Sequence, residues 1–265
     1  MPDTYFTFQT LVPVRRSAAD SAEMVTQLLF GDLVEMLARD RQWLRVRNRS
    51  DGYEGWIDEK MVLPVDGGWL SAVVGWEYIL EPCALLRTSF AGADLPLYLT
   101  TGARLPRLAG AEEARMIGLE IAGWKLEADP SLVFPDQGAG VPGILEVSEH
   151  YLGAPYLWGG KSIWGIDCSG FVQMVFAICG VALPRDASQQ VTLGAEVGWA
   201  DRRGGDLAFF TNENGKVTHV GLVLPDGNVR HAAGHVHDTR LEPEGLVSRY
   251  SGMQTHQLFK IKRIV

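Results

Sequence analysis

The chain has 265 residues, of which 46% are hydrophobic and 21% are charged. This balance is typical of folded globular proteins and excludes a disordered chain, and the length predicts two or three domains. The 32 acidic residues outnumber the 24 basic ones and give a formal net charge of −8. A net acidic chain lacks the electrostatic signature of proteins that bind nucleic acid or an anionic membrane surface, so we expect neither partner.

The cysteines and the first residues of the chain bear on its location. Cys83, Cys168 and Cys179 form no CxxC pair, and an odd number of cysteines fits a reducing compartment better than an oxidising one. The N-terminal residues lack the basic segment and unbroken apolar segment of a signal peptide. No apolar stretch approaches the length of about 18 residues that a membrane helix needs. We therefore expect a cytoplasmic protein.

The first part of the chain, residues 1–64, consists of short apolar runs separated by turns. Around Leu44 and Val46, apolar and polar residues alternate, which predicts half-buried strands. Closely spaced short strands are typical of a small barrel. The segments 27–32 (QLLFGD) and 52–57 (GYEGWI) resemble bacterial SH3-like domains. We expect such a domain at 1–64.

Residues 65–138 continue in the same style with less definition. Ile117, Leu119 and Ile121 alternate with smaller or polar residues, which predicts another strand. Several glycines and prolines exclude a long helix there. A second SH3-like barrel is therefore expected at 65–138, and the Pro/Gly-containing stretch 135–140 is the clearest linker.

The hydrophobic pattern changes after this linker. Apolar residues at helical spacing predict a helix over 144–152 and a second over 168–179, which Gly180 ends. Three strands follow, at about 206–210, 217–224 and 228–231, separated by turn sequences. Helices followed by an antiparallel sheet are an α+β order.

Cys168 is the first candidate for chemistry. Asp167 is a good N-cap residue, so Cys168 should occupy the first position of the second helix. The helix dipole at that position favours a thiolate, and we expect the thiol pKa to lie below its ordinary value of about 8.5. A cysteine with no function would instead be a small buried side chain, as we expect for Cys179.

Two histidines lie on the predicted strands that follow. His219 is in an otherwise apolar strand, and His231 is in its expected neighbour. A hairpin between the two strands can bring both side chains to one face of the sheet. A thiol activated by one imidazole, which a second polar group orients, is the arrangement of a cysteine nucleophile with its base.

Five motifs in order give a more specific resemblance. These are 156–160 (YLWGG), 165–172 (GIDCSGFV), 183–186 (LPRD) with Gln189, 205–210 (GDLAFF) and 219–221 (HVG). They resemble the NlpC/P60 family of cysteine peptidases. The resemblance implies an α+β fold in which a papain-like catalytic domain at 139–265 follows two small SH3-like β-barrels, at 1–64 and 65–138.

The resemblance also implies roles and a substrate. Cys168 would be the nucleophile, His219 the base and acid, and His231 the residue that orients His219. With the SH3-like domains, the chain resembles peptidases that cleave the γ-D-Glu–diamino acid bond of murein stem peptides with a free N-terminal L-Ala, without a cofactor. Substrate contacts would come from Asp32, Tyr53, Tyr156, Asp167, Ser169 and Asp186. Asp32 stands where the family usually has Glu, and Ala187 where it often has Ser.

The sequence leaves three alternative functions open. His231, His235 and His237 could hold zinc, although no HExxH helix accompanies them, and we expect no metal. The chain could be a non-catalytic protein that binds wall peptides through its SH3-like domains. It could also use the same catalytic fold as an amidase or acyltransferase.

Overall fold

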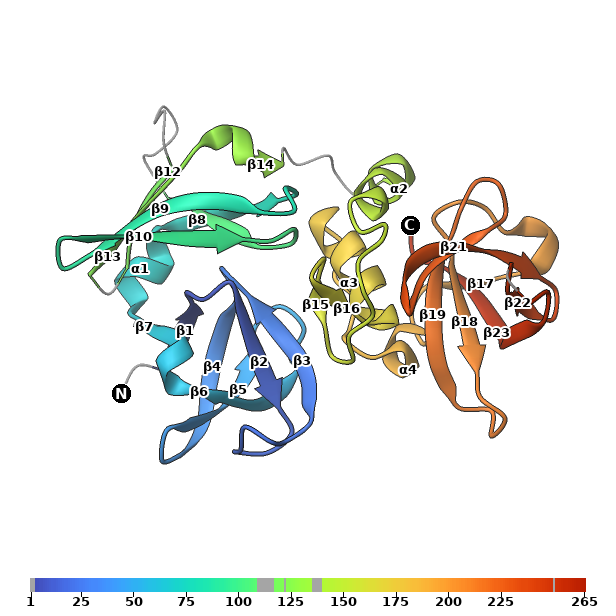
Figure 1. Cartoon of the computed structure of the whole chain (residues 1–265), viewed down its shortest axis with the longest axis horizontal. Helices are drawn as coiled ribbons and strands as arrows, with labels where there is room; N and C mark the ends of the chain where they lie inside the picture. The colour runs from blue at the N-terminus through green and yellow to red at the C-terminus, as the bar shows by residue number, and fades with distance from the viewer. Residues whose placement is uncertain (1–2, 109–116, 122, 135–139, 250) are drawn as a thin grey trace. The chain divides into compact units, whose positions relative to one another are not determined.

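The computed structural model describes residues 3–108, 117–121, 123–134, 140–249 and 251–265. It divides into two compact units, Met1–Asp136 and Gln137–Val265, and each is described by itself (Figure 1). The predicted boundary at residue 138 and most of the predicted linker fall on 135–139, outside the described residues. The other domain boundary, at residue 64, stays a prediction.

The first unit begins with one antiparallel sheet of seven strands, in the order β3-β2-β6-β5-β4-β1-β7. Alternation of buried and exposed residues in β5 confirms the strand predicted around Leu44. The core of the seven-stranded sheet includes Val12, Leu28 and Ile57. The strands are β1 (Thr4–Thr7), β2 (Leu11–Arg15), β3 (Met24–Leu29), β4 (Leu33–Asp40), β5 (Trp43–Asn48), β6 (Glu54–Asp58) and β7 (Val62–Val65), with a 3₁₀ turn at Glu59–Met61.

The rest of the first unit forms two smaller antiparallel sheets, β10-β9-β13-β12 and β11-β8-β14. Buried residues from both halves of the unit, such as Phe6, Phe30, Leu86 and Leu105, share one hydrophobic core. This shared core explains why the unit is compact as a whole. The elements are α1 (Gly67–Ala72), β8 (Val73–Ile79), β9 (Ala84–Phe90), β10 (Ala93–Leu99), β11 (Arg104–Leu108), β12 (Ile117–Ile121), β13 (Trp124–Ala128), a 3₁₀ turn at Pro130–Leu132 and β14 (Val133–Phe134).

The second unit sets helices beside a seven-stranded antiparallel sheet, in the order β17-β23-β18-β19-β20-β21-β22 (Figure 1). An additional pairing of β22 with β23 closes the sheet on itself. The helices are α2 (Val141–Glu149), α3 (Cys168–Ile178) and α4 (Ala187–Gln190). The strands are β15 (Lys161–Ser162), β16 (Gly165–Ile166), β17 (Ala195–Val197), β18 (Leu207–Thr211), β19 (Val217–Val223), β20 (Val229–Ala233), β21 (His235–Glu242), β22 (Gly245–Val247) and β23 (Gln254–Arg263), with a 3₁₀ turn at Trp199–Asp201.

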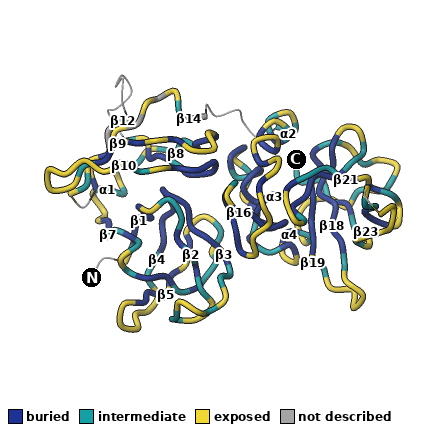
Figure 2. The backbone as a smooth tube through the Cα atoms, in the orientation of Figure 1, coloured by how far each residue is buried: buried dark blue, intermediate teal, exposed yellow. Residues whose placement is uncertain are grey.

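Both predicted helices of the second unit are confirmed. The first begins and ends three residues earlier than expected, because Gly140 and Pro142 start it. The second begins at Cys168 as predicted and is almost wholly buried (Figure 2). Gly180 follows it with a φ of 78°, the left-handed conformation that ends helices.

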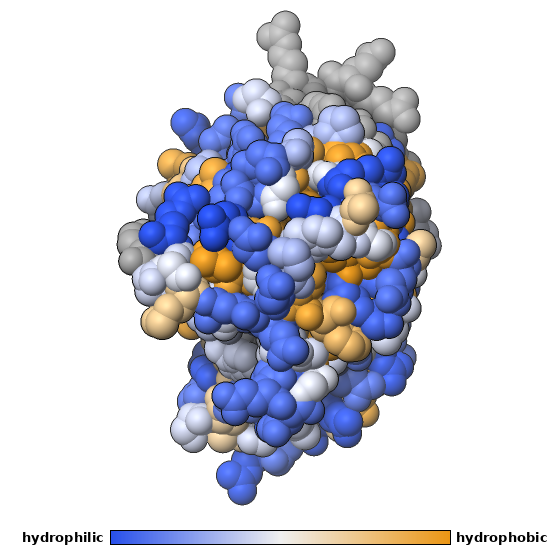
Figure 3. All heavy atoms as spheres, turned by 90° about the vertical axis from the view of Figure 1, so that its right-hand side faces the viewer, coloured by the Kyte–Doolittle hydropathy of each residue, from blue (hydrophilic) through white to orange (hydrophobic). Residues whose placement is uncertain are grey.

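The face of the molecule drawn in Figure 3 is mainly polar. Figure 3 shows one face of the molecule on which hydrophilic side chains predominate, with smaller hydrophobic areas between them. Within the described part of the chain, no helix has both the length and the hydropathy to cross a bilayer.

Candidate active site

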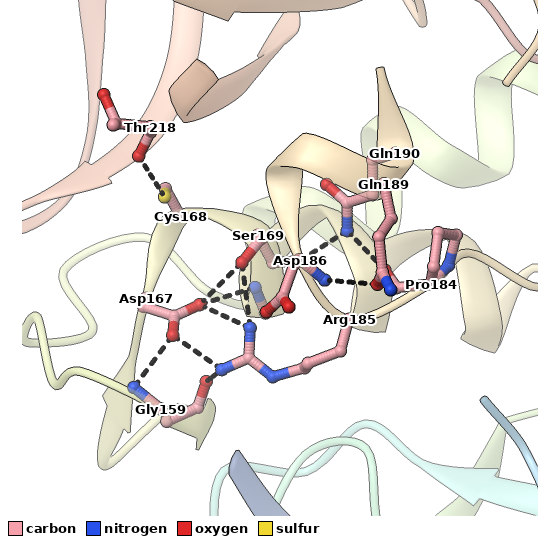
Figure 4. Close-up of polar contacts among 12 residues, drawn as sticks. Gly159, Asp167, Cys168, Ser169, Pro184, Arg185, Asp186, Gln189, Gln190 and Thr218 are labelled. Carbon is pink, nitrogen blue, oxygen red and sulfur yellow. Dashed lines mark hydrogen bonds and ion pairs between the residues drawn. The ribbon is translucent and has the colours of Figure 1, made fainter. Parts of the chain in front are cut away.

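Cys168 lies at the first position of α3, beside the strand that carries His219. Its Sγ donates to the Thr218 carbonyl oxygen at 3.9 Å (Figure 4), and the backbone N–H of Val220 also interacts with the sulfur. Thr218 and Val220 are the residues on either side of His219 in β19. The thiol is therefore held against the strand backbone at the position of the predicted base.

The thiolate expected from the helix dipole is wrong for this structure. Cys168 is 7% exposed, and its burial, with the neighbouring Asp167 carboxylate, raises the pKa of its thiol to about 12. Backbone N–H groups of Ser169 and Val220 act in the opposite direction and are the weaker influence. The sequence showed the cap and the dipole but not the depth of burial, which disfavours a charged sulfur.

A buried ion pair holds the turn on which Cys168 sits. Asp167 caps α3 by accepting from the Gly170 N–H at 2.7 Å, and it accepts from the Gly159 N–H at 2.8 Å. The Arg185 guanidinium donates to both carboxylate oxygens, at 2.9 and 2.6 Å (Figure 4). Both side chains are buried, with 1% and 7% exposed for Arg185 and Asp167. Asp167 is therefore a positioning residue here, and its contact with substrate stays a prediction.

Arg185 also binds the rest of this turn. It donates to Ser169 Oγ at 2.9 Å and to the Gly160 carbonyl oxygen at 3.4 Å. Gly170 allows this packing, because a Cβ there would lie 2.4 Å from the Gly160 carbonyl oxygen. The backbone that approaches Gly170 is therefore the protein's own. Arg185 was missed as a functional residue, although a buried acid at a helix cap calls for a cationic partner.

The two predicted histidines are brought together. His219 in β19 and His231 in β20 are adjacent, with His219 Nε2 2.8 Å from His231 Nδ1. His231 Nε2 lies 2.9 Å from the hydroxyl oxygen of Thr239 in β21. All three residues are buried. The antiparallel hairpin predicted from the sequence is thus confirmed. Thr239, which sequence reasoning missed, extends the chain of hydrogen bonds that begins at the two histidines.

This chain of hydrogen bonds suits a base at His219. If His219 Nε2–H donates to His231 Nδ1, then His231 Nε2–H donates to Thr239, and His219 Nδ1 is left for the thiol. Burial lowers the pKa of His219 well below its ordinary value and lowers that of His231 to about 3. Both imidazoles are therefore neutral near pH 7, as a base and its orienting partner must be.

His256 in β23 is a third residue of the site, after Arg185 and Thr239, that the sequence did not reveal. Its ring stacks on the ring of His219 with centroids 4.3 Å apart and an interplanar angle of 29°. Burial lowers its pKa as well. It stands 37 positions beyond His219 in sequence, in no recognised motif, so only the closure of the sheet shows the contact.

The remaining predicted substrate residues of the second unit are Tyr156, Ser169 in α3 and Asp186 at the start of α4. Tyr156 is 38% exposed, and burial of its hydroxyl, with the nearby Cys168 and Asp167, raises its pKa to about 12. Ser169 is buried and accepts from Arg185. Asp186 is half-buried at the start of α4, where its N–H donates to Gln189 Oε1 at 3.4 Å.

Asp32 and Tyr53 belong to the first unit. Asp32 is buried, accepts from the Leu29 N–H at 3.0 Å and forms an ion pair with Arg104 at 3.0 Å. Tyr53 is half-buried, and its N–H donates to Asp51. The contacts recorded for Asp32 serve the first unit itself, and its role in binding substrate stays a prediction.

The histidines considered as zinc ligands lie near one another but do not form a metal-binding group. The rings of His235 and His237 are 4.6 Å apart, and His237 Nδ1 donates to the His235 carbonyl oxygen. Among the residues that the structure describes, no group of three His, Cys, Asp or Glu side chains could hold a metal ion.

Comparison with known proteins agrees with this fold. Residues 153–257 match the model of the NlpC/P60 family, and residues 14–61 match that of the bacterial dipeptidyl-peptidase Sh3 domain. A cysteine at a helix start, beside a closed antiparallel sheet that carries two histidines, is the arrangement of papain-like hydrolases.

The chain belongs to the NlpC/P60 family and carries a bacterial SH3 domain. It is 31% identical to the gamma-D-glutamyl-L-lysine dipeptidyl-peptidase of Bacillus subtilis, over 78% of this chain and 71% of that protein. It is 27% identical to the protein of the same name from Bacillus cereus, over 88% and 75%. The crystal structure of an NlpC/P60 family protein from Bacillus cereus shares the fold, with a TM-score of 0.83, 21% identity, and 98% and 99% of the chains covered. The predicted fold class is confirmed.

The raised pKa of Cys168 predicts slow alkylation of the free protein. In a Cys83→Ser variant, which removes the exposed thiol, iodoacetamide should modify Cys168 slowly at pH 7. The rate should keep rising above pH 8.5 or so, because the thiolate becomes populated only there. Mass spectrometry of the labelled peptide against pH measures this. A rate that levels off below about pH 8 would show a preformed thiolate.

The stacked ring of His256 should position His219. We expect His256→Ala to lower kcat about ten-fold or more, because a misplaced base transfers its proton poorly. His256→Phe keeps an aromatic ring and should recover most of the rate. Equal losses in both variants, with unchanged thermal stability, would contradict a role based on stacking.

Proposed function

We propose that the protein is a cysteine peptidase that hydrolyses the γ-D-Glu–diamino acid bond of murein stem peptides. The observation that carries this proposal is the Cys168 thiol beside a hydrogen-bonded His219–His231–Thr239 chain. The names of the two Bacillus relatives support the choice of bond and of a lysine-type leaving group.

Because the Cys168 thiol and the His219 imidazole are both neutral at rest, the first step of the reaction includes a proton transfer between them. The thiol turns from the Thr218 carbonyl toward His219 and gives its proton to Nδ1 as the sulfur attacks the γ-carbonyl carbon of D-Glu. His219 then becomes an imidazolium while its Nε2–H still donates to His231. His231 stays neutral because its pKa is about 3, so no second positive charge opposes this step.

His219 completes the reaction as an acid and then as a base. It protonates the amine of the departing diamino acid, leaving a thioester between D-Glu and Cys168. The same imidazole next accepts a proton from water, whose oxygen attacks the thioester carbon. The C–S bond then breaks, the dipeptide is released as the acid, and His219 returns the proton to the Cys168 sulfur. The products are L-Ala-γ-D-Glu and the free diamino acid, or the remaining peptide that begins with it.

Two groups would stabilise the oxyanion of each tetrahedral intermediate. One is the Cys168 backbone N–H, which lies in the first turn of α3 and has no partner within the helix. The other is the Tyr156 hydroxyl, which interacts electrostatically with Cys168. The pKa of Tyr156, about 12, keeps this hydroxyl protonated and able to donate.

The free amine of L-Ala requires an acidic partner when it leaves water. Asp186 at the start of α4 is the candidate within the catalytic unit, and Asp32 with Tyr53 are the candidates that the family resemblance supplies from the first unit. We further propose that the protein acts in the cytoplasm in recycling or turnover of wall peptides. Three cysteines that are all free support a reducing environment.

Release of lysine from L-Ala-γ-D-Glu-L-Lys tests the reaction. Cys168→Ala and Cys168→Ser should abolish release in folded protein, and His219→Ala should be nearly as damaging because members of a catalytic unit act together. His231→Ala should cost less, since His231 orients His219. Tight binding without release would support a non-catalytic protein instead, and transfer of the dipeptide to an added amine in place of water would support an acyltransferase.

A blocked N-terminus should prevent cleavage. We expect N-acetylated or muramyl-linked stems to be cleaved at least about 100-fold more slowly than the free peptide, because an acid left without its cationic partner is costly to bury. Asp32→Asn should reduce this preference and also lower the stability of the first unit, because Arg104 loses its partner. Asp94→Asn, at an exposed position, is the control. Equal rates on free and muramyl tripeptides would contradict this prediction.

A further inference from the structure

A polar groove lies next to the catalytic histidine in the second unit. The turn between β18 and β19, at the free end of their hairpin (Figure 1), forms one wall, and the start of β23 forms the other. Its volume is about 680 Å³. Amide and hydroxyl side chains predominate in the lining, and Glu213 is the one acidic residue among the described residues that line it.

Two lining residues connect the groove to the reacting groups. Thr218 lines it, and the Thr218 carbonyl oxygen accepts from the Cys168 thiol. His256 lines it too, and the His256 ring stacks on His219 at 4.3 Å. The groove therefore shares two of its lining residues with the surroundings of Cys168 and His219.

The chemistry of the proposed reaction places the departing residue on the side of the site where His219 lies. His219 must reach the amine of the leaving residue to protonate it, so that residue lies beside the imidazole when the bond breaks. We propose that the groove receives the diamino acid that is released, and that Glu213 pairs with the ammonium at the end of the diamino acid's side chain. This inference rests on the proposed function. It names Glu213 as a residue that selects the leaving diamino acid.

The turn that carries Glu213 is suited to this task. Asn212 Oδ1 accepts from the backbone N–H groups of Asn214 and Lys216, at 3.1 and 3.0 Å, which fixes the turn. Glu213 itself is exposed, and within the described residues no hydrogen bond or ion pair engages its carboxylate. A fixed backbone avoids the cost of ordering the turn when a ligand binds, and the unengaged carboxylate is available to a cation.

Two peptides separate recognition of the ammonium from all other effects. L-Ala-γ-D-Glu-L-Lys carries the ammonium, and L-Ala-γ-D-Glu-L-norleucine has the same aliphatic stem without it. Glu213→Gln should lower kcat/KM for the lysine peptide by about two- to five-fold, the range of a solvent-exposed ion pair, and leave the norleucine peptide unchanged. Glu213→Lys should lower it further for the lysine peptide alone, because like charges then oppose each other.

Two controls complete the design. Glu149→Gln removes an exposed carboxylate at the end of α2 and should change neither rate. Added salt should reduce the preference of the unmodified protein for lysine over norleucine, because salt screens exposed charge pairs. Thermal unfolding of each variant identifies any loss of fold.

The outcomes distinguish the two proposals. If Glu213→Gln leaves the ratio of lysine to norleucine rates unchanged, whether both rates fall or neither does, Glu213 does not bind the ammonium and this inference is wrong. The proposed function would still be supported by cleavage in the unmodified protein. If the unmodified protein cleaves neither peptide, the proposed function is wrong, and the assignment of the groove falls with it.

Discussion

The ion pair between Asp167 and Arg185 fixes the turn from which Cys168 projects. The Asp167 carboxylate caps α3 and accepts a hydrogen bond from the Gly159 N–H. It also accepts from both terminal nitrogens of the Arg185 guanidinium, whose side chain is 1% exposed. Removing either partner would leave an uncompensated buried charge, at a cost of about 3–5 kcal/mol. The position of Cys168 relative to β19 therefore depends on an ion pair that lies outside the proposed proton-transfer chain.

The burial that fixes this geometry also decides the charge of the site. It raises the pKa of the Cys168 thiol and lowers those of His219 and His231, so the resting groups are all neutral. A neutral pair avoids the cost of burying ions in the absence of substrate. The proposed reaction then creates its charges only when a carbonyl is present to accept the sulfur, with Tyr156 and the start of α3 ready to stabilise the oxyanion.

Closure of the sheet supplies the rest of the site. β19, β20 and β21 carry His219, His231 and Thr239 on neighbouring strands, so ordinary antiparallel pairing places them in hydrogen-bonding order. β23 pairs with both β18 and β22 and brings His256 onto the ring of His219. The same strand forms a wall of the groove assigned to the leaving residue, so in the proposed reaction a single strand would contribute to proton transfer and to specificity.

The sequence by itself determined the features that depend on neighbours along the chain. Asp167 as a cap, Cys168 at the first turn of α3 and the β19–β20 pairing of the two histidines follow from helix-capping preferences and hairpin geometry, which act over a few residues. The family motifs add the fold of the whole chain. Only the tertiary structure decided the protonation of Cys168, the role of Arg185 and the contact of His256, because burial and long-range packing set electrostatic energies and no local pattern records them.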